Sequence, residues 1–286
     1  METVEGPLLI VAGPGSGKTR VITHRIAYLV RVCGIAPYRI AAVTFTNKAA
    51  REMRNRLDRL LGARAEDLTC GTFHSFCASI LRRDGHHLGL DRSFVIYDDE
   101  DQASIIKRAM EEAKIDPKRY PVGAVRSVIS GAKSNLLDPA GFAPTVHSYY
   151  EELVLRVYER YQGLLSQSKA VDFDDLLMLA VHLLQRQPEV LERYRSRYLH
   201  LLIDEFQDTN VAQYTLAKLL ASKYRNICVV GDPDQSIYRW RNADIRNILS
   251  FQKDYPDAKV VNLAENYRST QTILEAAKGL IATNKS

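Results

Sequence analysis

Two short segments far apart in the sequence carry residue types that could together act on a nucleotide phosphate. AGPGSGKT (12–19) follows the apolar residues 8–11, and the pair Asp204 and Glu205 follows the apolar residues 199–203. Glycines let a loop turn tightly, so that backbone N–H groups face phosphate oxygens, and a lysine adds positive charge. A carboxylate at the end of a buried strand can hold Mg²⁺. The two segments therefore predict a site that hydrolyses a Mg-nucleotide.

The first segment fits the pattern [AG]-x-x-x-x-G-K-[ST], with alanine in place of glycine at its first position. Lys18 is suited to contact the β- and γ-phosphates, and the hydroxyl of Thr19 is suited to Mg²⁺. Because a strand pattern precedes the loop and a helix pattern follows it, we favour phosphate binding over a turn that binds nothing. The expected nucleotide-binding residues of the loop are Ala12, Gly13, Pro14, Gly15, Ser16, Gly17, Lys18 and Thr19.

The acidic pair and a third segment supply the remaining chemistry. We expect Asp204 to hold Mg²⁺ together with Thr19, and Glu205 to orient and deprotonate the attacking water. An acidic pair that only caps the next helix is less favoured, because an apolar run leads into it. In VVGDPDQ (229–235) the amide of Gln235 could sense the γ-phosphate. Ordinary helix-start chemistry, with the preceding aspartates as caps, stays open as the alternative.

The composition is that of an ordinary globular protein. The 286 residues are 46% apolar and 26% charged, and the net charge of +5 is only a mild lean towards polyanions. The sequence lacks an apolar run long enough for a membrane span and a basic-then-apolar leader, so we expect no membrane partner. The four cysteines are scattered, without a C-x-x-C pair. They predict reduced thiols in a cytoplasmic protein rather than a metal cluster.

Short apolar runs alternate with amphipathic stretches, which is typical of an α/β fold with a parallel sheet flanked by helices. Several runs are almost continuously apolar, as expected for strands that are covered on both faces. The expected strands are 8–12, 40–44, 67–71, 199–204, 227–231 and 259–262.

The middle of the chain differs, because between about residues 98 and 187 helical patterns replace strand patterns. The expected helices there are 100–113, 122–133, 147–165 and 173–184. The third has an apolar stripe at three- and four-residue steps, which indicates a core face rather than a cofactor site. We therefore expect a discontinuous nucleotide-binding domain (1–85 and 190–286) with an all-helical insertion subdomain (86–189).

The residues resemble a known family, the UvrD/PcrA/Rep-like superfamily 1A DNA helicases, over essentially the whole chain. The collinear order and spacing of the matching strings make the resemblance specific. The strings are AGPGSGKTR (12–20), VTFTNKAAREM (43–53), GTFHSF (71–76), DFDDLL (172–177), LLIDEFQDTN (201–210), VVGDPDQSIYRWRNA (229–243) and ENYRST (265–270).

The resemblance implies a P-loop, RecA-like fold that uses ATP and Mg²⁺. It implies that Arg20 lies against the adenine and that Tyr267 stacks on it. It further implies that Gln235 and Arg268 contact the γ-phosphate, with Arg268 acting as an arginine finger. The catalytic residues it implies are Lys18, Glu205, Gln235 and Arg268.

The resemblance also implies binding of single-stranded DNA and of single-strand/duplex junctions, by base stacking and phosphate contacts. The matching positions are Phe45, Thr72, His74, Tyr238, Trp240 and Arg241. Trp240 lies between two arginines in a polar stretch, which suits a stacking platform, although a core anchor is its alternative. His74 could equally be a capping or a core histidine.

The string DFDD (172–175) invites interpretation as a metal site, which we reject. Asp172 has the position of a helix N-cap, and acids in a first helical turn are favoured by the helix dipole. We expect a structural role for this segment.

Two features of the family pattern are missing. Family members carry an N-terminal segment with a glutamine that contacts the adenine, and a second RecA-like domain beyond the string with Arg268. We expect the chain to be a fragment of a helicase that moves 3′ to 5′ on single-stranded DNA in repair or replication restart. By itself it should bind nucleotide weakly and unwind nothing. A RecB/AddA-like helicase–nuclease and a nucleotide-gated DNA-binding scaffold without turnover are the alternatives.

Overall fold

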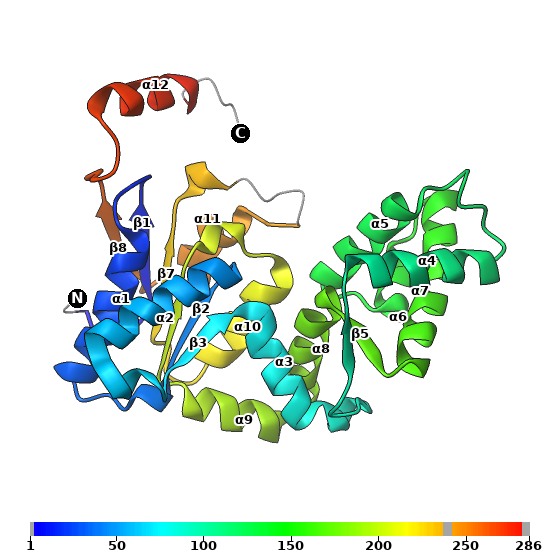
Figure 1. The fold of residues 1–286 in the computed structure, drawn as a ribbon, viewed down its shortest axis with the longest axis horizontal. Helices are drawn as coiled ribbons and strands as arrows, with labels where there is room; N and C mark the ends of the chain where they lie inside the picture. Colours follow the sequence, from blue (N-terminus) through cyan, green and yellow to red (C-terminus); the bar gives the residue numbers. More distant parts are fainter. Residues whose placement is uncertain (1–2, 237–241, 282–286) are drawn as a thin grey trace. The chain divides into compact units, whose positions relative to one another are not determined.

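The computed structural model describes residues 3–236 and 242–281. They form two compact units (Figure 1). We call residues 1–72, 194–209 and 220–286 the sheet unit, and residues 73–193 and 210–219 the helical unit. Each unit is described by itself.

The sheet unit is built on a parallel sheet, which confirms the predicted α/β fold class. Its order in the described part of the chain is β3-β2-β6-β7-β1-β8, and every neighbouring pair is parallel (Figure 1). The strands are β1 (Leu8–Ala12), β2 (Ile40–Thr44), β3 (Thr69–Thr72), β6 (His200–Ile203), β7 (Ile227–Gly231) and β8 (Lys259–Leu263). Three strands have the predicted bounds, whereas β3, β6 and β8 differ from them by one or two residues.

Helices complete the sheet unit. Four of them lie wholly in it: α1 (Lys18–Arg31), α2 (Asn47–Leu61), α11 (Arg246–Asp254) and α12 (Gln271–Ile281). Two of the boundaries between the units, 193/194 and 219/220, fall within α9 (Pro188–Arg197) and α10 (Val211–Ala221). Of the residues that the structure describes, none belongs to a helix long and apolar enough to cross a membrane.

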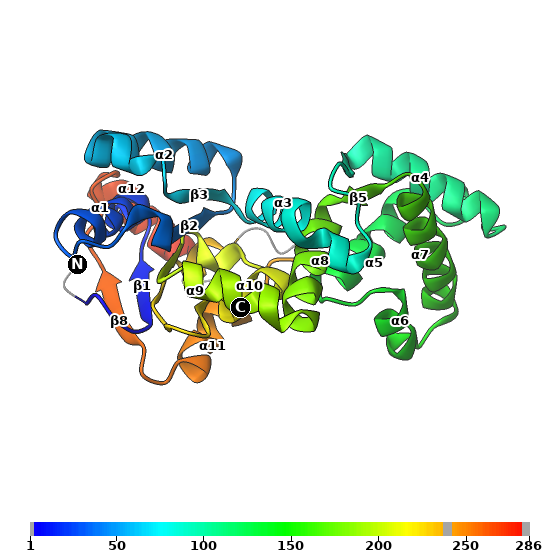
Figure 2. The same ribbon diagram turned by 90° about the horizontal axis from the view of Figure 1, so that it is seen from below.

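The core of the sheet unit explains why the strand sequences are so apolar. Alternate residues such as Leu8 and Ile10 of β1 pack with Ile22 and Ile26 of α1 and with Met53 of α2. All five side chains are at most 4% exposed. Figure 2 shows α2 alongside β2 and β3. Burial of this apolar surface stabilises the sheet that carries the loops at its edge.

The helical unit contains the helices predicted for the middle of the chain, together with a small second sheet. Its helices are α3 (Phe73–Asp84), α4 (Asp99–Glu112), α5 (Val122–Ser134), α6 (Pro139–Phe142), α7 (Tyr149–Gln167) and α8 (Phe173–Arg186). Capping boxes at Asp98, Ser148 and Asp172 fix the starts of α4, α7 and α8. The predicted core stripe of α7 is confirmed, with Val154, Val157 and Tyr158 fully buried.

One expectation for this region was wrong. β5 (Ala170–Asp172) lies within the stretch that we predicted to lack strands, and it pairs in parallel with β4 (Val95–Tyr97). A strand of three residues is too short to show an alternating pattern, so only its tertiary partner reveals it.

The units also divide the chain at other residues than the domains that we predicted. The helical unit begins at residue 73, not 86, because α3 packs against α8 and Asp84 forms an ion pair with Arg193. Residues 210–219 join it as well. The predicted boundaries 85/86 and 189/190 rested on the change from strand patterns to helical patterns, which does not record such contacts.

Candidate nucleotide-binding site

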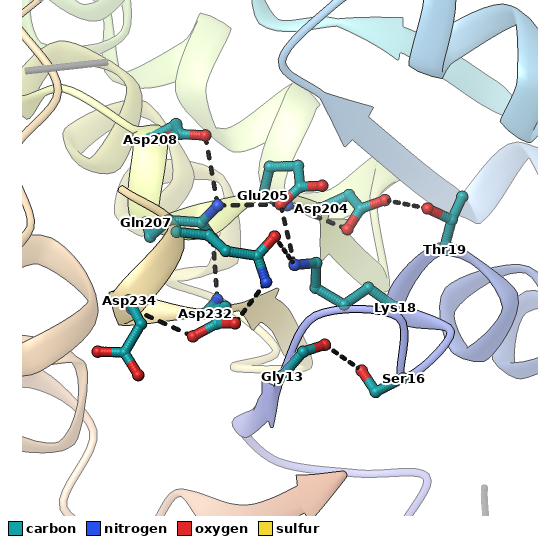
Figure 3. A network of polar contacts seen from close by, with 11 residues as sticks. Gly13, Ser16, Lys18, Thr19, Asp204, Glu205, Gln207, Asp208, Asp232 and Asp234 are labelled. Atoms are coloured by element: carbon teal, nitrogen blue, oxygen red, sulfur yellow. Dashed lines mark hydrogen bonds and ion pairs between the residues drawn. The ribbon is translucent and has the colours of Figure 1, made fainter. Parts of the chain in front are cut away.

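The loop between β1 and α1 has the geometry that its glycines suggest. Gly15 and Gly17 adopt positive φ angles of 68° and 89°, which side chains other than glycine rarely tolerate. The Ser16 hydroxyl donates a 2.7 Å hydrogen bond to the carbonyl of Gly13 and closes the turn (Figure 3). Gly17 is the N-cap of α1 and has no side chain with which to cap it. The N–H groups at the start of α1 therefore suit a bound anion.

Lys18 lies between groups from two other strand ends. Its Nζ donates to Oε1 of Gln235 at 3.0 Å. The same Nζ lies 3.6 Å from Oε2 of Glu205 (Figure 3). The Lys18 side chain is only 10% exposed. β1, β6 and β7 are adjacent in the sheet, so the residues that follow them meet at its carboxyl edge. The structure thus brings Lys18, Glu205 and Gln235 together.

Thr19 and Asp204 form a pair of oxygen donors beside the lysine. The Thr19 hydroxyl donates to Oδ2 of Asp204 at 3.0 Å, and the backbone N–H of Glu205 donates to Oδ1 at 3.0 Å. Burial, and then the charge of Glu205, raises the pKa of Asp204 to about 6, against opposing contributions from Thr19 and Lys18. A cation bound at this carboxylate would offset the free-energy cost of ionising it in a buried position.

The donor set fits Mg²⁺ in particular. Mg²⁺ is bound through one or two carboxylates, water and substrate phosphates rather than by a cage of protein ligands. Among residues 3–236 and 242–281 the structure has no cluster of three or more His, Cys, Asp or Glu side chains that could hold a metal. The Thr19 hydroxyl and the Asp204 carboxylate lie next to a phosphate-binding loop. They therefore suit Mg²⁺ that is held mainly by water and substrate phosphates.

Glu205 has an unusual backbone. Its φ of 51° and ψ of 45° lie in the left-handed region, directly after β6. Such conformations in non-glycine residues cost free energy and concentrate at functional sites. The conformation turns the chain sharply between Asp204 and the turn Phe206–Asp208, and it leaves the Glu205 side chain 35% exposed beside Lys18.

In the segment after β7 the helix-start chemistry is observed, while the contact of Gln235 with the γ-phosphate stays a prediction. Asp232 is the N-cap of the turn Pro233–Gln235 and accepts hydrogen bonds from the Asp234 N–H and from Nε2 of Gln235. Asp234 itself is exposed. The other end of the Gln235 amide faces Lys18. Helix-start chemistry therefore positions the amide that we expected at the γ-phosphate.

The segment after β8 contacts the loop between β1 and α1 through one backbone N–H and one side-chain amide. The Tyr267 N–H donates to the carbonyl of Gly15 at 3.1 Å, and Asn266 Nδ2 donates to the carbonyl of Pro14. Oδ1 of Asn266 accepts the N–H groups of Arg268 and Ser269, each at 2.8 Å. The Tyr267 and Arg268 side chains are exposed, as is that of Arg20 at the start of α1. The structure thus brings Tyr267 and Arg268 to the loop.

Sequence reasoning missed three polar residues of this site. Asn266 holds the last segment on the loop, Asp232 orients Gln235, and Gln207 lies between Glu205 and Asp232. The available signal was polar side chains directly after apolar strands. This signal led us to predict Asp204, Glu205 and Gln235 as site residues and Asp232 as a helix cap. It did not lead us to Gln207.

The expected DNA-binding residues are divided. Phe45 directly follows β2 and Thr72 ends β3, and the register of these neighbouring strands pairs Thr44 with Thr72. His74 is half-buried on α3 in the helical unit, where its ring lies edge-on to Phe173 at 5.7 Å. The remaining three lie outside the described residues: Tyr238, Trp240 and Arg241.

The acidic string at the start of α8 is structural in this chain. Asp172 is the N-cap of α8, as predicted, and its carboxylate lies 2.6 Å from Nζ of the fully buried Lys133. Asp175 lies 2.8 Å from the same ammonium group, and Tyr161 donates to Asp172 at 2.8 Å. The sequence pattern had not suggested that a lysine on α5 would neutralise these acids.

A parallel sheet with a phosphate-binding loop after its β1 strand and an Asp-Glu pair after β6 defines a RecA-like nucleotide-binding domain. Residues 1–256 match the family model of the UvrD/REP helicase N-terminal domain. The chain belongs to the UvrD/REP helicase family, as the resemblance had indicated.

Curated relatives agree with this assignment. The chain is 52% identical over 284 residues to an ATP-dependent DNA helicase PcrA of Staphylococcus aureus (strain Mu50 / ATCC 700699), which covers 99% of the chain and 39% of the relative. It is 51% identical over 286 residues to the ATP-dependent DNA helicase PcrA of Bacillus subtilis (strain 168), which covers 100% of the chain and 39% of the relative. The chain thus spans about two fifths of the length of these relatives.

Proposed function

We propose that this chain is the ATP-binding part of an ATP-dependent DNA helicase that moves 3′ to 5′ on single-stranded DNA. One observation carries the ATP-hydrolysing part of the proposal, while the direction of movement follows from the resemblance alone. Lys18 lies within 3.0 Å of Gln235 and 3.6 Å of Glu205, beside the Thr19–Asp204 pair. The names of the relatives, both ATP-dependent DNA helicases, support the substrate.

Each residue then has one role in hydrolysis. The loop N–H groups and Lys18 bind the phosphates, while Thr19 and Asp204 would hold Mg²⁺, which supplies positive charge when it is bound. Glu205 orients a water and takes its proton as the water oxygen bonds to the γ-phosphorus. The bond to the β–γ bridging oxygen breaks, which yields ADP and inorganic phosphate. Gln235 and Arg268 contact the γ-phosphate.

Arg20 and Tyr267 would hold the adenine from either side of the loop. The backbone bond from Tyr267 to Gly15 supports this assignment, because it keeps the exposed tyrosine ring next to the nucleotide loop. Stacking on an aromatic ring binds the face of a base and makes no hydrogen bond to its edge.

We propose a DNA track along Phe45, Thr72, His74, Tyr238, Trp240 and Arg241, in the cytoplasm. The carboxyl-edge position of the first two residues supports it. Free thiols at Cys33, Cys70, Cys77 and Cys228 suit a reducing compartment.

Movement along DNA needs two domains that close around ATP, so we propose that translocation needs the further length present in the relatives. The repair role belongs to the same proposal.

Glu205→Gln tests the assignment as an enzyme. We expect hydrolysis to fall by about 10²–10⁴-fold, because the general base is lost, while MgATP binding is kept. Single-turnover hydrolysis and fluorescence titration with a nucleotide analogue measure the two effects in the full-length protein. A wild-type protein that binds ATP and DNA but never turns over would instead favour the nucleotide-gated scaffold.

A further inference from the structure

Gln207 is a buried amide at the nucleotide site that the mechanism above does not use. It lies in the turn Phe206–Asp208, two residues after Glu205, and is 1% exposed. A buried primary amide is costly unless both of its ends form hydrogen bonds. Its partners therefore show what it does.

The Gln207 amide connects two strand ends. Its Nε2 donates to Oε2 of Glu205 at 2.9 Å and to Oδ2 of Asp208 at 3.3 Å, and its Oε1 accepts the Asp232 N–H at 3.0 Å (Figure 3). Its backbone carbonyl accepts the Ser236 hydroxyl at 3.4 Å. The partners dictate the orientation of the amide, because only an NH₂ group can face two carboxylates and only an oxygen can face an N–H.

Gly231 makes room for this connection. A Cβ at Gly231 would lie 2.7 Å from Oε1 of Gln207 and 2.9 Å from Cδ1 of Ile248. The glycine at the end of β7 is thus explained by the close approach of the Gln207 amide. β6 and β7 are neighbours, and Gln207 joins the residues that follow them.

The contacts continue from Gln207 into a closed ring. Asp232 accepts from Gln235, Gln235 accepts from Lys18, and Lys18 lies beside Glu205. Glu205 is partly exposed, so packing alone does not orient its carboxylate. Gln207 contributes a directional hydrogen bond to that carboxylate from a buried and doubly anchored position.

We propose that Gln207 is a positioning residue that sets the Glu205 carboxylate relative to Gln235, and hence the attacking water relative to the γ-phosphate. The inference rests on the proposed function. A displacement of a reacting group by about 1 Å can cost on the order of 10²-fold in rate.

Gln207→Met tests the proposal in the full-length protein. Methionine has a similar length but cannot donate to Glu205. We expect kcat for ATP hydrolysis to fall at least about tenfold, with KM for ATP changed by less than about twofold. Gln213→Met is the matched control. Gln213 is also a buried amide, at 3% exposure, but it bonds with Asn210 in the helical unit. We expect its kcat to match the wild type.

A second measurement separates positioning from a general loss of structure. If Gln207 acts through Glu205, Gln207→Met in a Glu205→Gln background causes no further loss of kcat, because the group it positions has already gone. If Gln207 has only a structural role, the loss of kcat in the double variant equals the product of the losses in the two single variants.

The outcomes also distinguish this proposal from the proposed function. A Glu205→Gln variant with unchanged hydrolysis would overturn the general-base assignment and the positioning role together. If Glu205→Gln abolishes hydrolysis while Gln207→Met stays within about twofold of wild-type kcat, only the positioning role is wrong. Multiplicative losses in the double variant overturn it as well.

Discussion

At the scale of single residues, Lys18 lies between an amide and a carboxylate that belong to other strand ends. A bound phosphate would compete with both for its ammonium group. The nearby Thr19–Asp204 and Gln207–Glu205 bonds show that each acid of the site already has a polar partner. Nucleotide binding thus exchanges partners within a preformed polar site, which lowers the cost of ordering it.

Gly15 makes the sharpest prediction about the loop. At its φ of 68°, a Cβ would lie 2.6 Å from Nδ2 of Asn266 and 2.7 Å from Cβ of Arg268. We expect Gly15→Ala to destabilise the sheet unit by about 1–2 kcal/mol, because a left-handed conformation is strained in alanine. It should also weaken nucleotide binding, since the segment with Tyr267 must move.

Urea unfolding and nucleotide titration measure the two effects. Gly123→Ala is the control, because a Cβ there meets nothing within 4 Å and alanine favours the helix α5. An unchanged unfolding midpoint for Gly15→Ala would contradict the prediction.

At the scale of elements, the carboxyl edge of the sheet positions the site, while an ion cluster joins α5 to α8 in the helical unit. Burial alone would lower the pKa of Lys133, but Asp172 and Asp175 more than offset this and raise it. Burial first, and then the charge of Asp172, raises the pKa of Asp175 to about 6, and Lys133 opposes the rise. Two carboxylates share one ammonium group, so the second is costly to ionise.

This cluster predicts a pH dependence of stability in the helical unit. The pKa of Asp175 is about 6 in the folded chain and near 3.8 in an unfolded one, so the folded state binds more protons between these values. The contribution of Asp175 is therefore fully present below about pH 4 and is lost as the pH rises through 6.

Asp175→Asn should remove the part of the pH dependence that arises from Asp175, because asparagine cannot ionise. Its side-chain oxygen can still accept a hydrogen bond from Lys133. We expect the free energy of unfolding of the variant, minus that of the wild type, to be larger at pH 7.5 than at pH 4.5. Hydrogen exchange of α5 and α8, corrected for intrinsic rates, measures it in this unit. A difference that does not change with pH would rule out the titration of Asp175.

At the scale of the whole molecule, the chain combines a nucleotide-binding sheet unit with a separate helical unit. It spans about two fifths of the length of its helicase relatives. In the sequence, Trp240 of the proposed DNA track lies between Arg239 and Arg241. Phe45 and Thr72, which we propose for this track, lie at the carboxyl ends of β2 and β3, on the same edge of the sheet as the loop after β1.

Binding of single-stranded DNA should be independent of sequence and should weaken steeply with salt, because phosphate contacts release counterions. Trp240→Ala in the full-length protein should lower the affinity by about 5- to 150-fold, the effect of losing about 1–3 kcal/mol of stacking. Fluorescence anisotropy with a labelled oligonucleotide measures both effects.

The control for this variant is Tyr38→Ala. Tyr38 is also an exposed aromatic, at 52%, but it precedes β2 and so lies at the amino edge of the sheet. Equal losses for both variants would show that the stacking assignment of Trp240 is wrong.

The residue pattern alone was enough to predict the fold class, most strands and the residues that we expect at the nucleotide site. Buried parallel strands need continuous apolar runs, and the loop and the acidic pair depend on local residue types at fixed spacing. Four features emerged from the folded chain instead: α3 packs with the helical unit, β5 pairs with β4, Lys133 neutralises Asp172 and Asp175, and Gln207 joins Glu205 to Asp232. Each of these depends on contacts between residues distant in sequence or on a local conformation, such as that of Glu205, that spacing does not encode.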